Sequence, residues 1–426
     1  MGLAGVGPTE ADRRRAPPTA ALRIAFFVDV FPRISNTFIL NQINGLLDRG
    51  HQLDIFARSL KPFERNHGEL YRYDLEARLK HFVIPGSWAR RVSLAAGQLL
   101  RPYAWRPAVL DALDFRRHGS KALNLSQLYT TLSFLRHSDY DVVHAQFGKL
   151  GPALLPLKRS GALRAPLVVS FRGADLSSAL EKNPRIYDEL FGAAELLLPV
   201  SEYFRQKLIA AGAPAERTCV LHSGIETERF PFAVRSRAPE EETRVLFIGR
   251  LTEKKGLTDA IEAVARTIAS GRRIRLTVVG EGELEESARR QAEEAGIAPQ
   301  VTWLGAQNSA GVVAQLARAH LLVAPSVTAS DGDQEGIPNV VKEAMASGLP
   351  VLSTRHSGIP ELVEDGVSGF LVEERSPEQL HRRLRELVDR PELWPSMGRA
   401  GRAKVVAEYD SAKLNDRLVE LYRSLR

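Results

Sequence analysis

The chain has 426 residues, which is too long for one hydrophobic core and predicts two or three domains, and its 44% hydrophobic and 26% charged residues are ordinary for a soluble globular protein. A single cysteine, Cys219, excludes an internal disulfide and fits a reducing compartment, and the lack of an apolar run of about 18 residues argues against a membrane-spanning helix. The net charge of +7 suits nucleic acid, anionic lipid or phosphorylated substrates.

The N-terminal half begins with a stretch rich in Gly, Pro and Arg, residues 1–20, which lacks the apolar core of a signal peptide and is expected to be a disordered tail. From there to residue 225, short apolar runs typical of buried parallel strands alternate with helical patterns. This alternation predicts a Rossmann-like α/β domain with a doubly wound parallel sheet. Strands are expected at 23–28, 52–57, 141–145, 166–171, 195–200 and 218–221, and helices at 38–49 and 201–211.

A basic helical insertion is expected in this domain at about residues 85–135. Over residues 80–121, eight basic residues are opposed only by Asp111 and Asp114, and they alternate with apolar and aromatic residues such as Trp88. Basic and aromatic residues on one helix are typical of a segment that lies on anionic lipid. The alternative is a solvated helical insertion. Nucleic-acid binding is disfavoured because no recognised motif is present and the basic residues are confined to this insertion.

The alternating pattern breaks at residues 226–243, which hold two prolines and a charge cluster and are expected to be an interdomain linker. A second Rossmann-like domain is expected over 244–403, and the final segment, 404–426, is expected to be one helix that could pack back across both domains. Two such sheets leave a cleft between the carboxyl ends of their strands, where ligands bind in this architecture. Strands of the second sheet are expected at 244–249, 274–279, 301–304, 321–324, 350–353 and 369–372.

Two glutamates eight residues apart, Glu335 and Glu343, form the most informative motif. Pro338 suits the first helical turn and Gly348 suits a left-handed cap, so Glu335 is expected on the loop entering a helix and Glu343 inside it. The N–H groups of residues 336–339 lie between them and would attract phosphate. The carboxylates would repel phosphate, so sugar hydroxyls are their expected partners, which suggests a nucleotide-sugar. The alternative is a surface helix with two exposed glutamates.

Three further loops follow predicted strands. Arg250 and Lys255 can both reach a diphosphate over the helix that starts near residue 256, although exposed basic residues at a turn are the alternative. The glycines at 280 and 282 lack the third glycine of a dinucleotide fingerprint and are expected to form a tight turn near the cleft. Asp331 and Asp333 match a metal-binding D-x-D pattern, but this spacing is common by chance and we do not assign a metal site to it.

These motifs together resemble the retaining glycosyltransferases of family 4, which have the GT-B fold. The likeness covers about residues 244–372, and it is looser in the N-terminal half, where it is greatest to transferases of bacterial exopolysaccharide and colanic-acid-type assembly. The matching segments are Gly249-Arg250-Leu251, Lys254-Lys255-Gly256, 278–282, 303–305, 335–351 and 357–363, with 32–38, 141–148 and 170–175 in the N-terminal half.

The resemblance implies a role for each matching position. Arg250 and Lys255 would bind the donor diphosphate and stabilise it as it leaves, Glu343 would hold the ribose hydroxyls, and Glu335 would contact the transferred sugar. No metal or other cofactor is expected, because cationic side chains and the helix start would stabilise the leaving diphosphate in place of a metal ion. The anomeric configuration would be kept, with the leaving phosphate helping to deprotonate the incoming hydroxyl. The implied donor-binding residues are Gly249, Arg250, Lys255, Gly280, Glu335, Gly336, Ile337, Pro338, Asn339 and Glu343.

The N-terminal half departs from the family pattern at two positions. The usual His-x-His reads His144-Ala145-Gln146, and Arg172 replaces a histidine that usually precedes glycine. His144 is expected among the catalytic residues with Glu335, Arg250 and Lys255, although packing or capping is the alternative for it. Gln146 cannot act as a base, and Arg172 could bind a phosphate, so activity could be altered or reduced. The expected acceptor-side residues are Ser35, Asn36, Thr37, Gln146 and Arg172, with Ser35 alternatively a helix N-cap.

The sequence therefore predicts a hexosyltransferase that moves a sugar from a UDP- or GDP-sugar to a glycan or lipid-linked saccharide in bacterial surface polysaccharide biosynthesis. It is expected in the cytoplasm, where it could contact the inner face of the membrane peripherally. Two alternatives stay open. A GT-B sugar-nucleotide epimerase would share the cleft but not the basic loops, and a non-catalytic sugar-nucleotide-binding partner would explain the missing second histidine.

Overall fold

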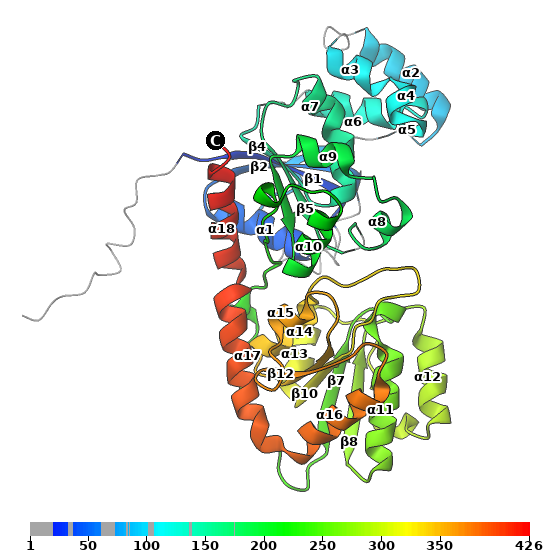
Figure 1. Ribbon diagram of the computed structural model, residues 1–426, viewed down its shortest axis with the longest axis vertical. Coiled ribbons are helices and arrows are strands. Elements are labelled where there is room, and N and C mark those ends of the chain that lie inside the picture. Colours follow the sequence, from blue (N-terminus) through cyan, green and yellow to red (C-terminus); the bar gives the residue numbers. More distant parts are fainter. Residues whose placement is uncertain are drawn as a thin grey trace, which may run out of the picture.

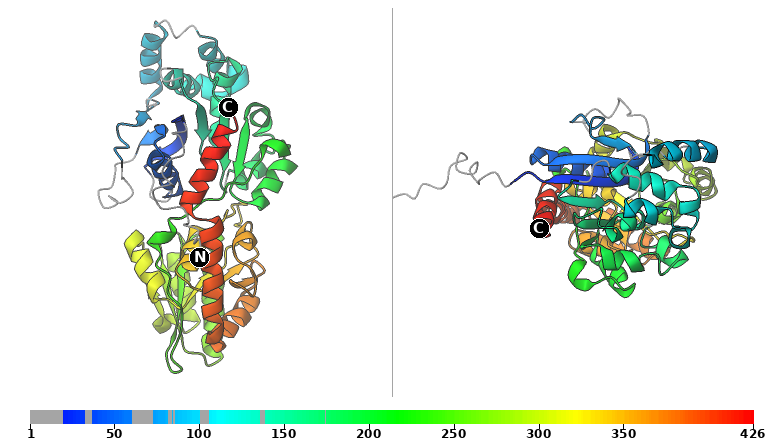
Figure 2. Two further views of the ribbon diagram at one scale, coloured as in Figure 1. Left: turned by 90° about the vertical axis from the view of Figure 1, so that its left-hand side faces the viewer. Right: turned by 90° about the horizontal axis from the view of Figure 1, so that it is seen from above.

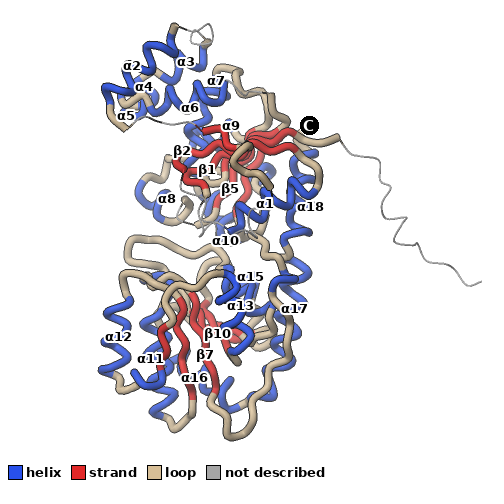
Figure 3. Tube along the Cα trace, turned by 180° about the vertical axis from the view of Figure 1, so that it is seen from behind, coloured by secondary structure: helices blue, strands red, loops and turns tan. Residues whose placement is uncertain are grey.

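The computed structural model describes residues 20–32, 37–60, 73–81, 84, 86–100, 106–135, 139–173 and 175–426. Two α/β domains lie end to end, each with a parallel sheet between layers of helices (Figure 1). Seen from behind, the two sheets occupy the centres of the two domains (Figure 3). The expected disordered tail, apart from residue 20, lies outside the described residues.

The N-terminal sheet has six parallel strands in the order β3-β2-β1-β4-β5-β6. Its central strands are buried on both faces, as parallel strands covered by helices must be. Helices α1 (Thr37–Asp48) and α10 (Glu202–Ala210) are among those that cover it. The strands are β1 (Arg23–Phe31), β2 (Gln52–Leu60), β3 (Leu79–His81), β4 (Val142–Ala145), β5 (Leu167–Phe171) and β6 (Leu196–Pro199).

The C-terminal sheet repeats this plan in the order β12-β11-β10-β7-β8-β9. Strand order reverses next to β7, the kind of switch point where ligands bind in doubly wound sheets. The strands are β7 (Thr243–Ile248), β8 (Ile274–Val279), β9 (Val301–Trp303), β10 (Leu321–Ala324), β11 (Val351–Thr354) and β12 (Gly369–Val372). The helices are α11 (Leu257–Ala269), α12 (Glu285–Glu294), α13 (Ser309–Arg318), α14 (Asn339–Ala346), α15 (Ile359–Leu362) and α16 (Pro377–Asp389).

The remaining helices of the N-terminal domain fall into two groups. Five form an insertion at the end of this domain that points away from the C-terminal domain (Figure 1). They are α2 (Trp88–Leu99), α3 (Pro107–Ala112), α4 (Phe115–His118), α5 (Ser120–Leu123) and α6 (Ser126–Leu135). The others are α7 (Leu155–Arg159), α8 (Ser178–Lys182) and α9 (Asp188–Ala193). None of the described helices is both long and apolar enough to span a bilayer.

The chain ends in two helices, α17 (Trp394–Glu408) and α18 (Ser411–Arg423), so the expectation of one helix over 404–426 is wrong. Asp410 breaks it, because its side chain caps α18 by accepting the N–H groups of Ala412 and Lys413. Helix α17 packs on α14 of the C-terminal domain, whereas α18 packs on α1 of the N-terminal domain. The two helices run along the side of both domains (Figure 2).

Two other predictions need correction. Residues 218–221 run beside β6 but do not form a regular strand. Thr218 makes one isolated bridge to Leu197, and the N–H groups of Cys219 and Leu221 donate to carbonyl oxygens of β6 at 3.0 Å each. The sequence also missed β3, which has three residues and is too short to show a period.

Candidate active site

A hollow of about 450 Å³ opens between the two domains, at the carboxyl ends of their strands. The N-terminal domain contributes Asp29, Phe38, Lys149 and Arg172, and the C-terminal domain contributes the loops after β7 and before α14. The sequence analysis predicted that ligands bind at these strand ends. The predicted residues that line the hollow are Arg172, Gly249, Arg250, Lys255, Glu335, Gly336, Ile337, Pro338 and Asn339.

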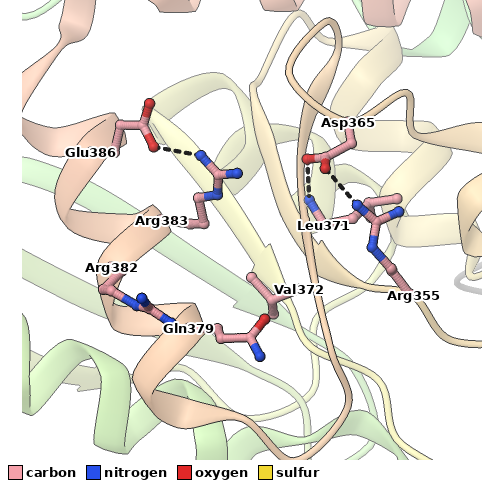
Figure 4. Close-up of a pocket in the computed structure, with 8 residues that line it drawn as sticks. All are labelled: Arg355, Asp365, Leu371, Val372, Gln379, Arg382, Arg383 and Glu386. Atoms are coloured by element: carbon pink, nitrogen blue, oxygen red, sulfur yellow. Dashed lines mark hydrogen bonds and ion pairs between the residues drawn. The ribbon is translucent and has the colours of Figure 1, made fainter.

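A second hollow, of about 440 Å³, lies within the C-terminal domain beside β12 and α16. Its arginines are close to carboxylates of their own: Arg355 points at Asp365, and Arg383 points at Glu386 (Figure 4). Arg382 points away from those pairs. Because most of its charge is neutralised locally and only one domain forms it, this hollow is a weaker candidate than the cleft.

The loop after β7 depends on glycines for its shape. Gly256 has a left-handed φ of 69°, and a Cβ there would lie 1.9 Å from the carbonyl oxygen of Pro325. Gly280 has a φ of 133°, and a Cβ there would lie 1.9 Å from the carbonyl oxygen of Gly249. Only glycine fits such a conformation and such a close approach. Gly280 therefore supports the Gly249 turn from behind and does not itself line the cleft.

Glu335 lies between two lysines at the floor of the cleft. The Lys255 ammonium is 3.1 Å from its Oε2 atom, and the Lys254 ammonium is 3.3 Å from its Oε1 atom. Lys254 also forms an ion pair of 2.8 Å with Asp333. Burial alone would raise the pKa of Glu335, but the two ammonium groups lower it to about 2. Glu335 is therefore ionised, and it can accept hydrogen bonds from hydroxyl groups but cannot donate a proton.

A buried histidine holds the backbone of Glu335 in place. The Glu335 N–H donates to Nε2 of His356 at 3.0 Å, so the proton of the neutral ring belongs on Nδ1, which donates to Glu374 at 2.6 Å. Glu374 in turn accepts the N–H of Thr328 at 2.6 Å. The sequence analysis missed this chain, whose only local signal is His356 in the loop after β11.

Helix α14 begins at the cleft with Pro338 as its N-cap residue. The first N–H groups of a helix have no partner within it and attract anions, and residues 336–340 line the hollow at this point. Glu343 lies further along the helix, outside the set of residues that line the hollow, and burial raises its pKa to about 7. Its neighbour Lys342 is fully buried and donates to the carbonyl oxygen of Ser223 at 2.6 Å.

Arg172 faces this helix from the N-terminal domain. Its guanidinium donates to the side chain of Gln146 at 2.9 Å, to the hydroxyl of Ser223 at 3.0 Å and to Gln42 at 3.2 Å. It also lies 4.3 Å from the centre of the Phe38 ring. Burial lowers the pKa of Arg172 to about 10, so it stays charged at neutral pH. These contacts fix a cation on the N-terminal side of the cleft.

His144 does not reach the cleft, which corrects the expectation that it acts on the substrate. It is fully buried, with Nδ1 2.6 Å from the hydroxyl of Tyr422 and Nε2 2.8 Å from the hydroxyl of Ser170. Burial and the charge of Arg172 hold its pKa well below the usual range, so the ring is neutral. Gln146 is also fully buried and bonds both His144 and Arg172. Gln146 therefore supports Arg172 directly, and His144 supports it through Gln146. Helix α18 covers His144, because its Tyr422 bonds the ring.

The first acceptor-side loop lies mostly outside the described residues, which exclude Ser35 and Asn36. Thr37 is the first residue of α1. The sequence analysis missed two charged residues of this side. Asp29 follows the middle of β1 and pairs with Arg58 at 2.5 Å, and the Lys149 ammonium lies 3.9 Å from Asp29. Their local signal is position, since Asp29 lies near the end of β1 and Lys149 lies in the segment that follows β4.

The two domains contact each other directly beside the cleft. Glu361 of the C-terminal domain caps α10 of the N-terminal domain, accepting the N–H groups of Glu202 at 2.8 Å and Tyr203 at 3.0 Å. Gln334, which adjoins Glu335, accepts a hydrogen bond from Lys207 of the same helix at 2.6 Å. The cleft residues of the C-terminal domain are therefore positioned by side chains and backbone of the N-terminal domain.

Comparison with known proteins assigns each half of the chain to a sequence family. Residues 229–404 match the family described as Glycosyl transferases group 1, and residues 35–224 match the family described as Glycosyl transferase 4-like domain. The chain is 35% identical over 410 residues to WcaL of Salmonella typhimurium, with 95% of this chain and 100% of the relative covered. It is 34% identical over 408 residues to AmsK of Erwinia amylovora, with the same coverage.

Solved structures share the fold. HepE of Anabaena, in a complex with UDP, has a TM-score of 0.70 at 19% identity, with 95% of this chain and 100% of that chain covered. The lipopolysaccharide outer core galactosyltransferase WaaB in its apo form has a TM-score of 0.65 at 16% identity, with 93% and 99% covered. At these identities the likeness concerns the two-domain architecture.

Proposed function

The chain is a glycosyltransferase of family 4, group 1, with the GT-B fold, and from this premise we propose that it moves a sugar from a UDP- or GDP-sugar to a growing exopolysaccharide. WcaL and AmsK are named for colanic acid and amylovoran biosynthesis, respectively. They match the chain over 95% of its length, which supports a substrate of the same class. HepE was solved with UDP and with UDP-glucose, which supports a nucleoside diphosphate-sugar as the donor.

The observation that carries the proposal is the ionised Glu335 between Lys254 and Lys255, next to the start of α14. The diphosphate of the donor would lie against the helix start, Arg250 and Lys255, since all three favour anions. Glu335 would accept hydrogen bonds from hydroxyls of the transferred sugar. Glu343, deeper along α14, would hold the ribose. Helix α14 and the loop that enters it would thus contact both the sugar and the nucleotide of the donor.

The arrangement of charges favours a reaction in which the leaving group acts as the base. The bond between the anomeric carbon and the diphosphate oxygen breaks, and both electrons go to the diphosphate. The acceptor hydroxyl attacks from the same face, and its proton passes to the departing phosphate oxygen. Arg250 and Lys255 would stabilise the charge that develops on the diphosphate. Glu335 is a poor base, because its pKa is about 2.

The acceptor would enter from the N-terminal domain, where Arg172 and Lys149 line the cleft. Both cations could bind a phosphate or an acidic sugar of the acceptor. We propose that the acceptor is a lipid-linked saccharide and that the enzyme works in the cytoplasm, at the inner face of the membrane. The relative from Mycobacterium tuberculosis named as a phosphatidylinositol monomannoside mannosyltransferase, at 28% identity over 299 residues, supports an acceptor of this kind.

A thermal-shift panel of nucleotides and nucleotide-sugars tests the proposal. A ligand at a hundred times its dissociation constant stabilises the folded state by about 2.7 kcal/mol, so the correct base should raise the melting temperature clearly. Arg250→Ala should abolish the shift, whereas Arg382→Ala should retain it, because Arg382 is an exposed arginine of the other hollow. If no nucleotide shifted the melt of the unchanged chain, the proposed function would be wrong.

A further inference from the structure

The helical insertion exposes an unusual amount of apolar surface. Among the described residues, eight large apolar side chains are at least 46% exposed, and six of these belong to the insertion. Monomeric soluble proteins seldom leave apolar side chains gathered in this way without a binding role. We call this surface the insertion face. It consists of Trp88, Leu94, Leu100, Leu110, Phe115 and Leu123.

Helix α2, which contributes Trp88 and Leu94 to the insertion face, buries little of its own surface. Ala95 is the one side chain of α2 described as buried, so nearly all of this helix is accessible. Polar contacts hold α2 in place: Trp88 donates to the carbonyl oxygen of Leu123 at 3.4 Å, and Arg91 donates to that of Asn124 at 2.8 Å. The first of these contacts brings two exposed residues of the insertion face together. The apolar side chains are therefore left for something outside the domain.

Positive charge accompanies these apolar side chains. Described residues 86–123 hold six basic residues and two acidic ones. Arg117 pairs with Asp111 at 2.9 Å and lies 3.5 Å from Asp114, which accounts for both acidic residues. Arg90, Arg106, Arg116 and Lys121 are exposed and form no ion pair with any described residue. The insertion face thus carries a net positive charge that its own carboxylates do not neutralise.

We propose that the insertion face docks the enzyme on an anionic lipid surface. Apolar side chains would enter the boundary between headgroups and acyl chains, and the unpaired cations would contact lipid phosphates. A second copy of the chain suits this surface less well, because a twofold contact would place the same cations opposite one another. A neutral membrane would leave those cations without partners.

The position of the insertion fits this role. It lies at the end of the N-terminal domain that faces away from the C-terminal domain (Figure 1). Docking would hold the N-terminal domain on the lipid and leave the C-terminal domain free to move against it. The benefit of docking rests on the proposed function, because docking brings the enzyme to its acceptor only if that acceptor is lipid-linked. Lipid binding itself does not depend on turnover, so the two can be tested separately.

The test is sedimentation of the full chain with vesicles of phosphatidylcholine, with and without phosphatidylglycerol. Binding should require phosphatidylglycerol and should weaken as salt is raised. Replacing both Arg116 and Lys121 with Ala should lower vesicle affinity about thirtyfold, because each basic contact contributes about fivefold. The pair Leu110→Ser and Phe115→Ser should lower it at least about tenfold. Val367→Ser and Arg382→Ala serve as controls, because they remove an exposed apolar and an exposed basic side chain of the C-terminal domain.

All variants should keep the melting temperature and the nucleotide-induced shift of the unchanged chain, since the substituted side chains are exposed and lie outside the cleft. Equal binding to both kinds of vesicle, no loss in either insertion variant, or a dimer that covers the insertion face would each overturn the docking proposal. Vesicle binding without any nucleotide-induced shift would instead uphold docking and refute the proposed function.

Discussion

Replacing Lys342 with Met should stabilise the protein at neutral pH and lose that advantage at alkaline pH. Lys342 is fully buried in α14, and its ammonium has one hydrogen bond, to the carbonyl oxygen of Ser223 at 2.6 Å. Burial, with a smaller contribution from the charge of Arg172, lowers its pKa from 10.5 to about 7, although the charge of Glu343 acts in the opposite direction. Methionine has a similar length and carries no charge to desolvate.

The direction in which stability changes with pH follows from the protons bound by the folded and unfolded chains. Between pH 7 and 10.5 the unfolded chain keeps the Lys342 proton and the folded chain releases it, so stability rises with pH over this window. The shift of about 3.5 pKa units corresponds to roughly 5 kcal/mol of lost stability below pH 7. Methionine removes that loss but leaves the Ser223 carbonyl unbonded, which costs about 1–3 kcal/mol. At pH 7 the folded-state lysine is half deprotonated and the loss is about 4 kcal/mol, so the variant should be more stable by about 1–3 kcal/mol there and should lose this advantage near pH 10.

Urea unfolding followed by tryptophan fluorescence, repeated from neutral to alkaline pH, measures the difference in free energy of unfolding between the two proteins. Taking the difference cancels the titration of groups that do not interact with Lys342, which leaves Glu343, whose pKa the Lys342 charge lowers, as a coupled group to account for. Lys182→Met is the matched control, because Lys182 is exposed and its removal should give a difference that does not vary with pH. A pH-independent difference for Lys342→Met would refute the assignment of a depressed pKa to this residue.

Three further substitutions probe the cleft. Glu335→Gln should lower the rate of sugar transfer at least about 100-fold, whereas nucleoside diphosphate alone should bind at least as tightly, because two lysines lose their carboxylate; weaker nucleotide binding would contradict this. Glu361→Ala removes the contact between the domains at the start of α10, where Glu361 accepts two N–H groups, and should raise the donor KM about 5- to 30-fold with a smaller effect on kcat, as steady-state kinetics can show; an unchanged KM would argue against it. Tyr422→Phe should cost about 1–3 kcal/mol in urea unfolding and should lower kcat, because His144 loses a buried partner behind Arg172; wild-type values for both would rule out this support.

Local pattern accounts for most of the fold. Eleven of the twelve strands correspond to predicted apolar runs, and only β3 was missed. A buried strand or an amphipathic helix shows a period within a few residues, so each can be recognised without knowledge of the rest of the chain. Pro338, which begins α14, and Gly348, which follows it with a φ of 85°, act within a single turn of backbone. The errors occurred where strand pairing is marginal, as at Thr218, and where one capping side chain starts a new helix within a helical pattern, as at Asp410.

The sequence by itself determined the C-terminal side of the cleft, since the loops after β7 and before α14 carry their chemistry in consecutive residues. Only the tertiary structure decided the N-terminal side. His144 was assigned to catalysis, but a hydroxyl 278 positions away in α18 binds its ring and removes it from the cleft. Glu361 caps a helix that begins 159 positions earlier. Such contacts depend on how distant elements pack, and burial then fixes which polar groups must pair, which no local pattern records.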